Sequence, residues 1–65
     1  MEKLINELKD RIPDELEDVH EYHELAAIAE EHGHPTVAHY LRIIAHEEHT
    51  HAEYLKHAVD TLEKV

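Results

Sequence analysis

The chain of 65 residues has no cysteine, no tryptophan and no phenylalanine, and it has a single glycine and two prolines. Without cysteine it can form no disulfide, no zinc–thiolate site and no iron–sulfur cluster. A chain this short buries only a small core, so a bound metal or oligomerisation must supply much of its stability. The scarcity of glycine, proline and aromatic residues favours helices over sheets.

Basic residues are also scarce, since 6 Lys and Arg stand against 16 Asp and Glu, for a formal net charge of -10. Nucleic-acid binding proteins carry a basic stripe, which this chain lacks, and its acidic surface should attract cations and be repelled by anionic membranes. The N-terminal segment is charged, unlike a signal peptide, and no apolar run could span a bilayer. We therefore expect a cytoplasmic protein with no nucleic-acid or membrane partner.

Histidine is unusually frequent in this chain, with 9 copies. Imidazole is a common ligand of transition metals, so this number raises the question of a metal site. Histidines on an acidic helical protein can equally be solvated surface residues. The position of each histidine along its helix has to show whether it is a metal ligand or a surface residue.

Gly33 and Pro35 mark one break in the chain. Glycine suits the left-handed position just past a helix end, and proline suits the first turn of the next helix. They predict one domain, residues 1–65, made of an antiparallel hairpin with helices over about 2–32 and 35–63. Pro13 disfavours helical geometry before it, and we expect a continuous first helix that is kinked there.

Each expected helix carries an apolar stripe at helical spacing that polar residues interrupt at its middle. The stripe of the second helix consists of Val37, Leu41, Ile44, Glu48, His51, Leu55, Ala58 and Leu62. The stripe of the first consists of Ile12, Glu15, Val19, Tyr22, Ala26 and Ala29. Small residues near the turn, Ala26, Ala27 and Ala29, should let the helices approach closely.

Glu48 and His51 form an E-x-x-H motif whose spacing puts both side chains on one helix face, one turn apart. A charged group inside an apolar stripe is costly unless it is paired or binds a metal. Folding about the turn brings Glu15 to the same level. A carboxylate-bridged di-iron or di-manganese bundle needs an E-x-x-H motif from each of two helices and one Glu from each of two others. Two copies of this chain would together supply that set.

These residues resemble the ferritin-like superfamily, especially its rubrerythrin-type and encapsulated-ferritin-type proteins. The resemblance runs from about residue 14 to residue 62 and rests on a short set of positions, namely Glu15, Tyr22, Ala26, Ala29, Gly33 and the segment Ile44-Ala45-x-x-Glu48-x-x-His51-Ala52. It implies that Glu15, Glu48 and His51 are the catalytic and iron-binding residues. It further implies a homodimer that completes a ferritin-like four-helix bundle, as in encapsulated relatives with two-helix protomers.

The activity that the resemblance implies is oxidation of Fe(II) to Fe(III) by dioxygen or peroxide, for iron storage or detoxification, with Mn or Zn as substitute metals. Implied partners are a second copy, an encapsulin shell that would enclose the protein, or an electron-donor protein. Two alternatives remain open from the residues themselves: a rubrerythrin-like scavenger of peroxide or dioxygen, and a helical assembly module without catalysis.

The other polar residues receive weaker assignments. Tyr22 and Asp18 are candidates for positions beside the metal ligands. Tyr22 could donate a hydrogen bond to a ligand carboxylate or simply pack in the core, and Asp18 could belong to an entry route or a secondary site. Glu17 and His20 form a second E-x-x-H motif, which should face solvent because it points away from Glu15. The remaining histidines are expected at the turn or on outward faces.

Overall fold

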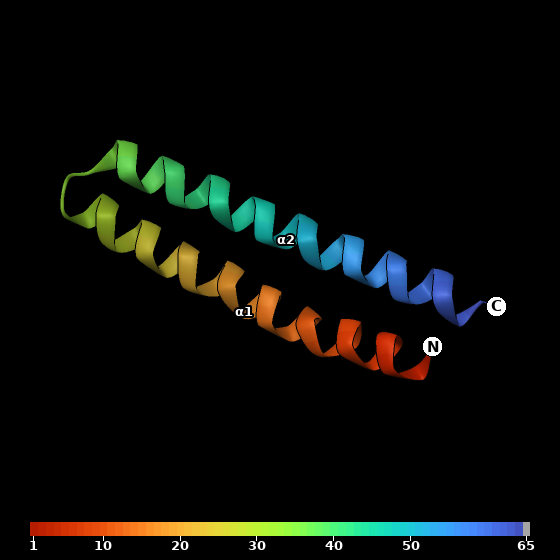
Figure 1. The fold of residues 1–65 in the computed structure, drawn as a ribbon. Coiled ribbons are helices and arrows are strands. Elements are labelled where there is room, and N and C mark those ends of the chain that lie inside the picture. Colours follow the sequence, from red (N-terminus) through yellow and green to blue (C-terminus); the bar gives the residue numbers. More distant parts are fainter. Residues whose placement is uncertain (65) are drawn as a thin grey trace.

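The computed structural model describes residues 1–64, which form two antiparallel helices joined by a tight turn (Figure 1). Helix α1 spans Glu2–Glu31 and helix α2 spans Pro35–Glu63. The start of α1 and the end of α2 lie at the end of the hairpin away from the turn, and the Cα atoms fill a rod of 51 × 14 × 10 Å. Residues 1–64 contain no strand, so the predicted all-α hairpin is confirmed.

The turn is closed by backbone hydrogen bonds that need a left-handed residue. Gly33 has φ +77°, its N–H donates to the Glu30 carbonyl at 3.1 Å, and the His34 N–H donates to the Ala29 carbonyl at 2.9 Å. This pair of bonds is the Schellman arrangement, in which glycine adopts the positive φ without steric cost. Pro35 is the first residue of α2, where its missing N–H costs nothing. The predicted turn is therefore confirmed to within one residue.

Pro13 lies inside α1 without interrupting it. A proline inside a helix removes one backbone donor and crowds the preceding turn, so neighbouring residues must hold the helix in place. The predicted continuity of this helix is confirmed, and the predicted kink stays a prediction.

The core of the hairpin consists almost entirely of alanine. Ala26, Ala38, Ala45 and Ala52 are at most 1 % exposed, Val59 is 5 % exposed, and no large side chain among the described residues is fully buried. The accessible surface is 4981 Å², whereas a compact monomer of this mass exposes about 4,300 Å². The isolated hairpin therefore buries little apolar surface. No helix within residues 1–64 is long and apolar enough to cross a membrane.

The contact line of α2 differs from the predicted stripe in half of its members. The buried row repeats every seven residues and comprises Ala38, Ala45, Ala52 and Val59. Their predicted counterparts one position earlier lie at the rim, where Val37, His51 and Ala58 are exposed and Ile44 is half-buried. The prediction favoured the larger apolar side chains, whereas small alanines let the backbones approach and so occupy the centre of the contact. Ala27, predicted at the contact, is also exposed.

Two rows of residues flank the contact line on opposite sides, because each residue turns the helix by about 100°. We call one the ion-pair flank; it comprises Lys9, Leu16, His23 and Glu30 of α1 with Arg42, His49, Lys56 and Glu63 of α2. Salt bridges Lys9–Glu63 at 2.8 Å and Arg42–Glu30 at 2.6 Å cross the hairpin along it. We call the other the open flank; it comprises Leu4, Arg11, Asp18 and Leu25 of α1 with Val37, Ile44, His51 and Ala58 of α2.

Candidate metal centre

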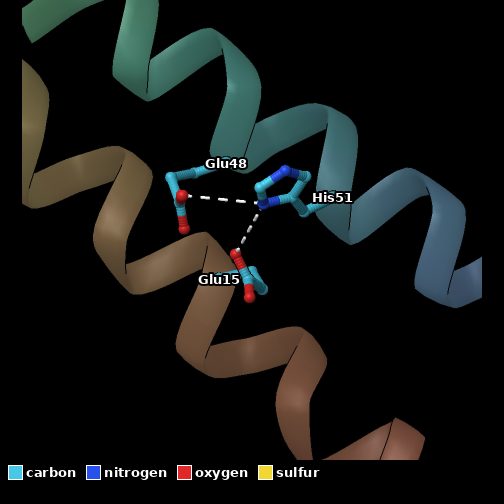
Figure 2. Close-up of side chains that lie close together, drawn as sticks. All are labelled: Glu15, Glu48 and His51. Atoms are coloured by element: carbon cyan, nitrogen blue, oxygen red, sulfur yellow. Dashed lines mark ion pairs between the residues drawn. The ribbon is translucent and has the colours of Figure 1, made fainter.

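Three potential metal ligands meet near the middle of the hairpin (Figure 2). Glu48 and His51 come from adjacent turns of α2, and Glu15 reaches them from α1. The i, i+3 spacing on α2 directs both side chains to the same side of the helix, and the close approach of the alanine rows brings α1 within reach. The structure thus brings together the three residues that the sequence predicted as a site.

The His51 ring turns its Nδ1 atom toward both carboxylates (Figure 2). Nδ1 lies 3.5 Å from Glu15 Oε2 and 3.6 Å from Glu48 Oε1, and the ligand atoms of the three residues all lie within 4.8 Å of one another. Among residues 1–64 this is the one group of three or more His, Asp or Glu side chains close enough to hold an ion. We call this group of Glu15, Glu48 and His51 the cup.

The two carboxylates of the cup are less exposed to solvent than its imidazole. The side chains of Glu15 and Glu48 are 25 % and 20 % exposed, whereas that of His51 is 54 % exposed. The sequence predicted that His51 faces the other helix, and this is wrong. The next residue, Ala52, is buried there, and His51 lies on the open flank. An exposed imidazole beside half-buried carboxylates leaves the cup accessible from that flank.

Two carboxyl groups in one half-buried place repel each other. The pKa of Glu48 is raised above its ordinary value of 4.5, first by a hydrogen bond shared with the Glu15 carboxyl, then by burial and by the negative charges of Glu15 and Asp18, with His51 acting in the opposite direction. When both carboxylates are ionised, buried Glu15 Oε2 has no hydrogen-bond partner. A shared proton or a bound cation would satisfy it.

The donor set suits a transition-metal ion. Carboxylate oxygen and imidazole nitrogen are hard to borderline donors that bind iron, manganese and zinc. Ligand atoms around a single ion stand about 3–3.5 Å apart, given bond lengths of about 2.1 Å. The distances from Nδ1 already approach that spacing. Glu15 Oε2, which is buried without a hydrogen-bond partner, is the strongest local sign that a cation belongs here.

Two residues, Asp18 and Tyr22, were predicted to lie beside the ligands. Asp18 is half-buried on the open flank, and its charge contributes to the raised pKa of Glu48. Tyr22 is half-buried, and its predicted bond to a ligand carboxylate stays a prediction. Glu17 and His20 are exposed, as expected for a solvated motif.

One comparison with known proteins gave a match. The family model described as Rubrerythrin matches residues 6–65, which include α2, nearly all of α1 and all three candidate ligands. Searches of curated proteins and of solved structures found no match. Membership of this family marks a ferritin-like, iron-binding type of protein. Because the match covers nearly the whole chain and includes the cup of Glu15, Glu48 and His51, the protein belongs to the rubrerythrin family.

Proposed function

We propose that two copies of this hairpin hold a pair of iron ions between their cups and oxidise Fe(II) to Fe(III) with dioxygen or peroxide, for iron storage or detoxification. The observation that carries the proposal is the cup of Glu15, Glu48 and His51, in which a buried carboxylate oxygen has no hydrogen-bond partner. One hairpin offers three ligands, and two hairpins offer the ligand set of a dinuclear carboxylate centre.

The open flank is the surface on which a second copy would lie. It carries large apolar side chains toward both ends, with Leu4, Leu25 and Val37 exposed by 45 %, 48 % and 49 %. The cup opens on the same flank, between these apolar residues. Pairing two such flanks would bury apolar surface that the alanine core leaves exposed and would bring the two cups together.

The three residues would share the work of binding the substrate iron. Glu48 lies at the level of the contact line and would bridge the two ions, while Glu15 and His51 would each bind one ion from the side. Flexible carboxylates accommodate both oxidation states, and a pair of ions can supply two electrons to an oxidant. Asp18 would add negative charge at the entrance and draw Fe(II) toward it.

The decisive experiment is aerobic addition of Fe(II) to metal-free protein, followed by near-ultraviolet ferric absorbance. We expect fast oxidation that saturates near one iron per chain, and its loss in Glu48→Ala. Glu47→Ala is the matched control, because Glu47 is the neighbouring carboxylate and is exposed outside the cup. Sedimentation of the same samples should show dimers.

Oxidation no faster than in buffer would refute the ferroxidase proposal. Equal loss in Glu47→Ala would also contradict it, because a general effect of surface charge would then explain the activity. A monomer that oxidises iron at full rate would leave the iron chemistry standing and overturn the shared site.

The family match supports a second candidate, a rubrerythrin-like scavenger that reduces peroxide or dioxygen and is then re-reduced. This chain has no cysteine to build a rubredoxin-like centre, so its electrons would come from another protein. Measuring peroxide consumption by the Fe(II) protein with a chemical reductant separates the candidates. Repeated turnover of peroxide without accumulation of ferric mineral would favour the scavenger.

A further inference from the structure

A row of residues with almost no charge runs along α2 on the side away from α1. We call it the outward row, and its members follow one another at alternating steps of four and three residues. They are Thr36, Tyr40, Ile43, Glu47, Thr50, Tyr54, His57 and Thr61. At about 100° per residue these positions lie opposite the buried alanine row of α2. Because both faces of α2 carry a helix-packing pattern, this helix has surface for two neighbours, and the hairpin supplies one of them.

The outward row differs from its counterpart on α1. The α1 positions that face away from α2 are Lys3, Glu7, Asp10, Asp14, Glu17, Glu21, Glu24, Ile28 and Glu31, so eight of these nine are charged. Glu47 is the single Asp, Glu, Lys or Arg among the eight members of the outward row. The α1 row has the composition of a solvated helix face. Depletion of charge together with tyrosine is instead typical of the centre of a protein–protein interface.

The outward row exposes three large side chains. Tyr40, Ile43 and Tyr54 are exposed by 61 %, 42 % and 68 %. Given about 200 Å² for a tyrosine side chain, the tyrosines of two copies together expose about 500 Å². That is a large share of the roughly 1,200 Å² that the smaller stable interfaces bury, before Ile43 and the threonines contribute.

The threonines of the row can lose water at little cost. The Thr50 hydroxyl donates to the His46 carbonyl at 3.1 Å, and the Thr61 hydroxyl donates to the His57 carbonyl at 2.8 Å. A hydroxyl that is bonded to its own helix has a partner whether or not solvent reaches it. Covering these residues with another helix therefore leaves neither hydroxyl unpaired.

The row is complementary to a second copy of itself that runs in the opposite direction. In an antiparallel pair of α2 helices whose two-fold axis lies between Glu47 and Thr50, Tyr40 is level with His57 of the second copy. Ile43 is then level with Tyr54 of the second copy, and Glu47 is level with its Thr50. Since a two-fold axis repeats each layer, one register places every large side chain of the row against an uncharged one.

The residues beside the row supply opposite charges in the same register. His39, His46, Glu53 and Asp60 form the row next to it and are all exposed. In the antiparallel pair, His39 lies beside Asp60 of the second copy and His46 lies beside its Glu53, and each pair occurs twice. An imidazole N–H donates to a carboxylate, and more strongly when the ring is charged. Glu53 Oε1 is 3.9 Å from His49 Nε2 of its own chain, beyond hydrogen-bond distance, so this carboxylate can accept such a bond.

We propose that the outward row binds the outward row of a second copy in this antiparallel register and so joins chains through a face separate from the open flank. A second copy fits the row better than an unrelated protein does, because one register matches the apolar layers and both histidine–acid pairs. Helix α2 is also where two such acidic chains repel each other least, since it has 5 acidic and 2 basic residues against 11 and 3 in α1.

This contact would join pairs of chains into larger assemblies. A dimer formed through the open flank presents two outward rows, so each dimer can bind others. Glu47 lies at the centre of the contact beside its own symmetry mate and weakens the contact by repulsion. We therefore expect it to form in concentrated protein, whereas dilute protein keeps only the dimer of the open flank.

The test is analytical sedimentation of metal-free protein in chelator over a range of concentrations. We expect the parent to form species larger than a dimer as its concentration rises. Ile43→Asp should weaken this association by more than about ten-fold, the effect of losing a central interface side chain. Ile28→Asp is the matched control, because Ile28 is 50 % exposed on the outward side of α1, and it should behave as the parent does.

A parent that stays at or below the dimer at every concentration would overturn the proposal. Equal effects of Ile43→Asp and Ile28→Asp would also overturn it. If the open flank formed no dimer, the outward rows would still pair single chains, and Ile43→Asp would then give monomers. Since neither variant changes the cup and no iron is present, the result is separate from that of the ferroxidase proposal.

A charge exchange tests the register. His39→Asp places two acidic groups together at both ends of the contact and should weaken the association. Adding Asp60→His to the same chain restores an imidazole beside a carboxylate and should recover the association of the parent. Circular dichroism of each variant should show unchanged helix content. A double variant that associates no better than His39→Asp alone would exclude the antiparallel register.

Discussion

Replacing Glu48 by glutamine should make the metal-free protein more stable while abolishing metal binding. The carboxyl atoms of Glu15 and Glu48 that face the cup lie within 4.8 Å of each other. At that separation two like charges repel by about 1 kcal/mol in water and about 3.5 kcal/mol at an effective dielectric constant of about 20. Glutamine keeps the shape of the side chain and removes this repulsion, with some loss of the attraction to His51.

We therefore expect Glu48→Gln to raise the free energy of unfolding of the metal-free protein by about 1–3 kcal/mol at neutral pH. Each kcal/mol corresponds to about 4–8 °C in melting temperature for a domain of this size. The assay is thermal unfolding followed by circular dichroism, with a chelator and with added Mn²⁺ or anaerobic Fe(II). Added metal should stabilise the parent and leave the variant unchanged.

The pH dependence supplies an internal check. Because the folded pKa of Glu48 is raised above 4.5, the folded protein binds this proton more tightly than the unfolded chain does. The parent is therefore destabilised above the raised pKa and recovers as the pH falls toward 4.5. The advantage of Glu48→Gln should shrink over the same interval and vanish below it.

Glu47→Gln serves as the control, since it removes a neighbouring exposed charge outside the cup. If Glu48→Gln were less stable than the parent in chelator, the repulsion between the two carboxylates would not be the dominant interaction in the cup. An advantage that persisted unchanged at acid pH would likewise refute the reasoning, because the parent carboxyl is then already neutral.

Three further perturbations probe the dimer, the turn and the ligand. Leu25→Asp, on the open flank, should shift sedimentation toward monomer and slow Fe(II) oxidation. Ile43→Asp, on an outward face of α2, should do neither. Equal effects of the two variants would argue against pairing through the open flank. Gly33→Ala should cost about 1–2 kcal/mol in thermal or denaturant unfolding because φ is +77° and no neighbouring atom obstructs the new methyl group, so an unchanged stability would contradict the strain argument. Metal affinity measured by titration should fall toward acid pH, since an imidazole nitrogen binds a metal only when it is not protonated. An affinity that is constant down to about pH 5 would exclude His51 as a ligand.

Much of the hairpin could be predicted because its signals are local. Gly33 and Pro35 specify a left-handed helix end and a helix start through their own backbone preferences. Glu48 and His51 share a helix face by their spacing alone, whatever lies opposite. The acidic composition and the absence of cysteine limit the metal site to oxygen and nitrogen ligands. The sequence also selected Glu15 among several acidic neighbours, from its position in an apolar stripe.

Tertiary packing decided which side of each helix faces the other. Spacing alone fits the row of Val37 and the row of Ala38 almost equally well, because they differ by one residue. Burial selects the alanine row, since small side chains let the backbones approach, and it moves His51 to the rim. The cross-hairpin register of Lys9–Glu63 and Arg42–Glu30 likewise depends on that contact. Local sequence thus determined the helices, the turn and the ligand types, whereas the packing of two helices decided the opening of the cup, because it depends on residues far apart in the chain.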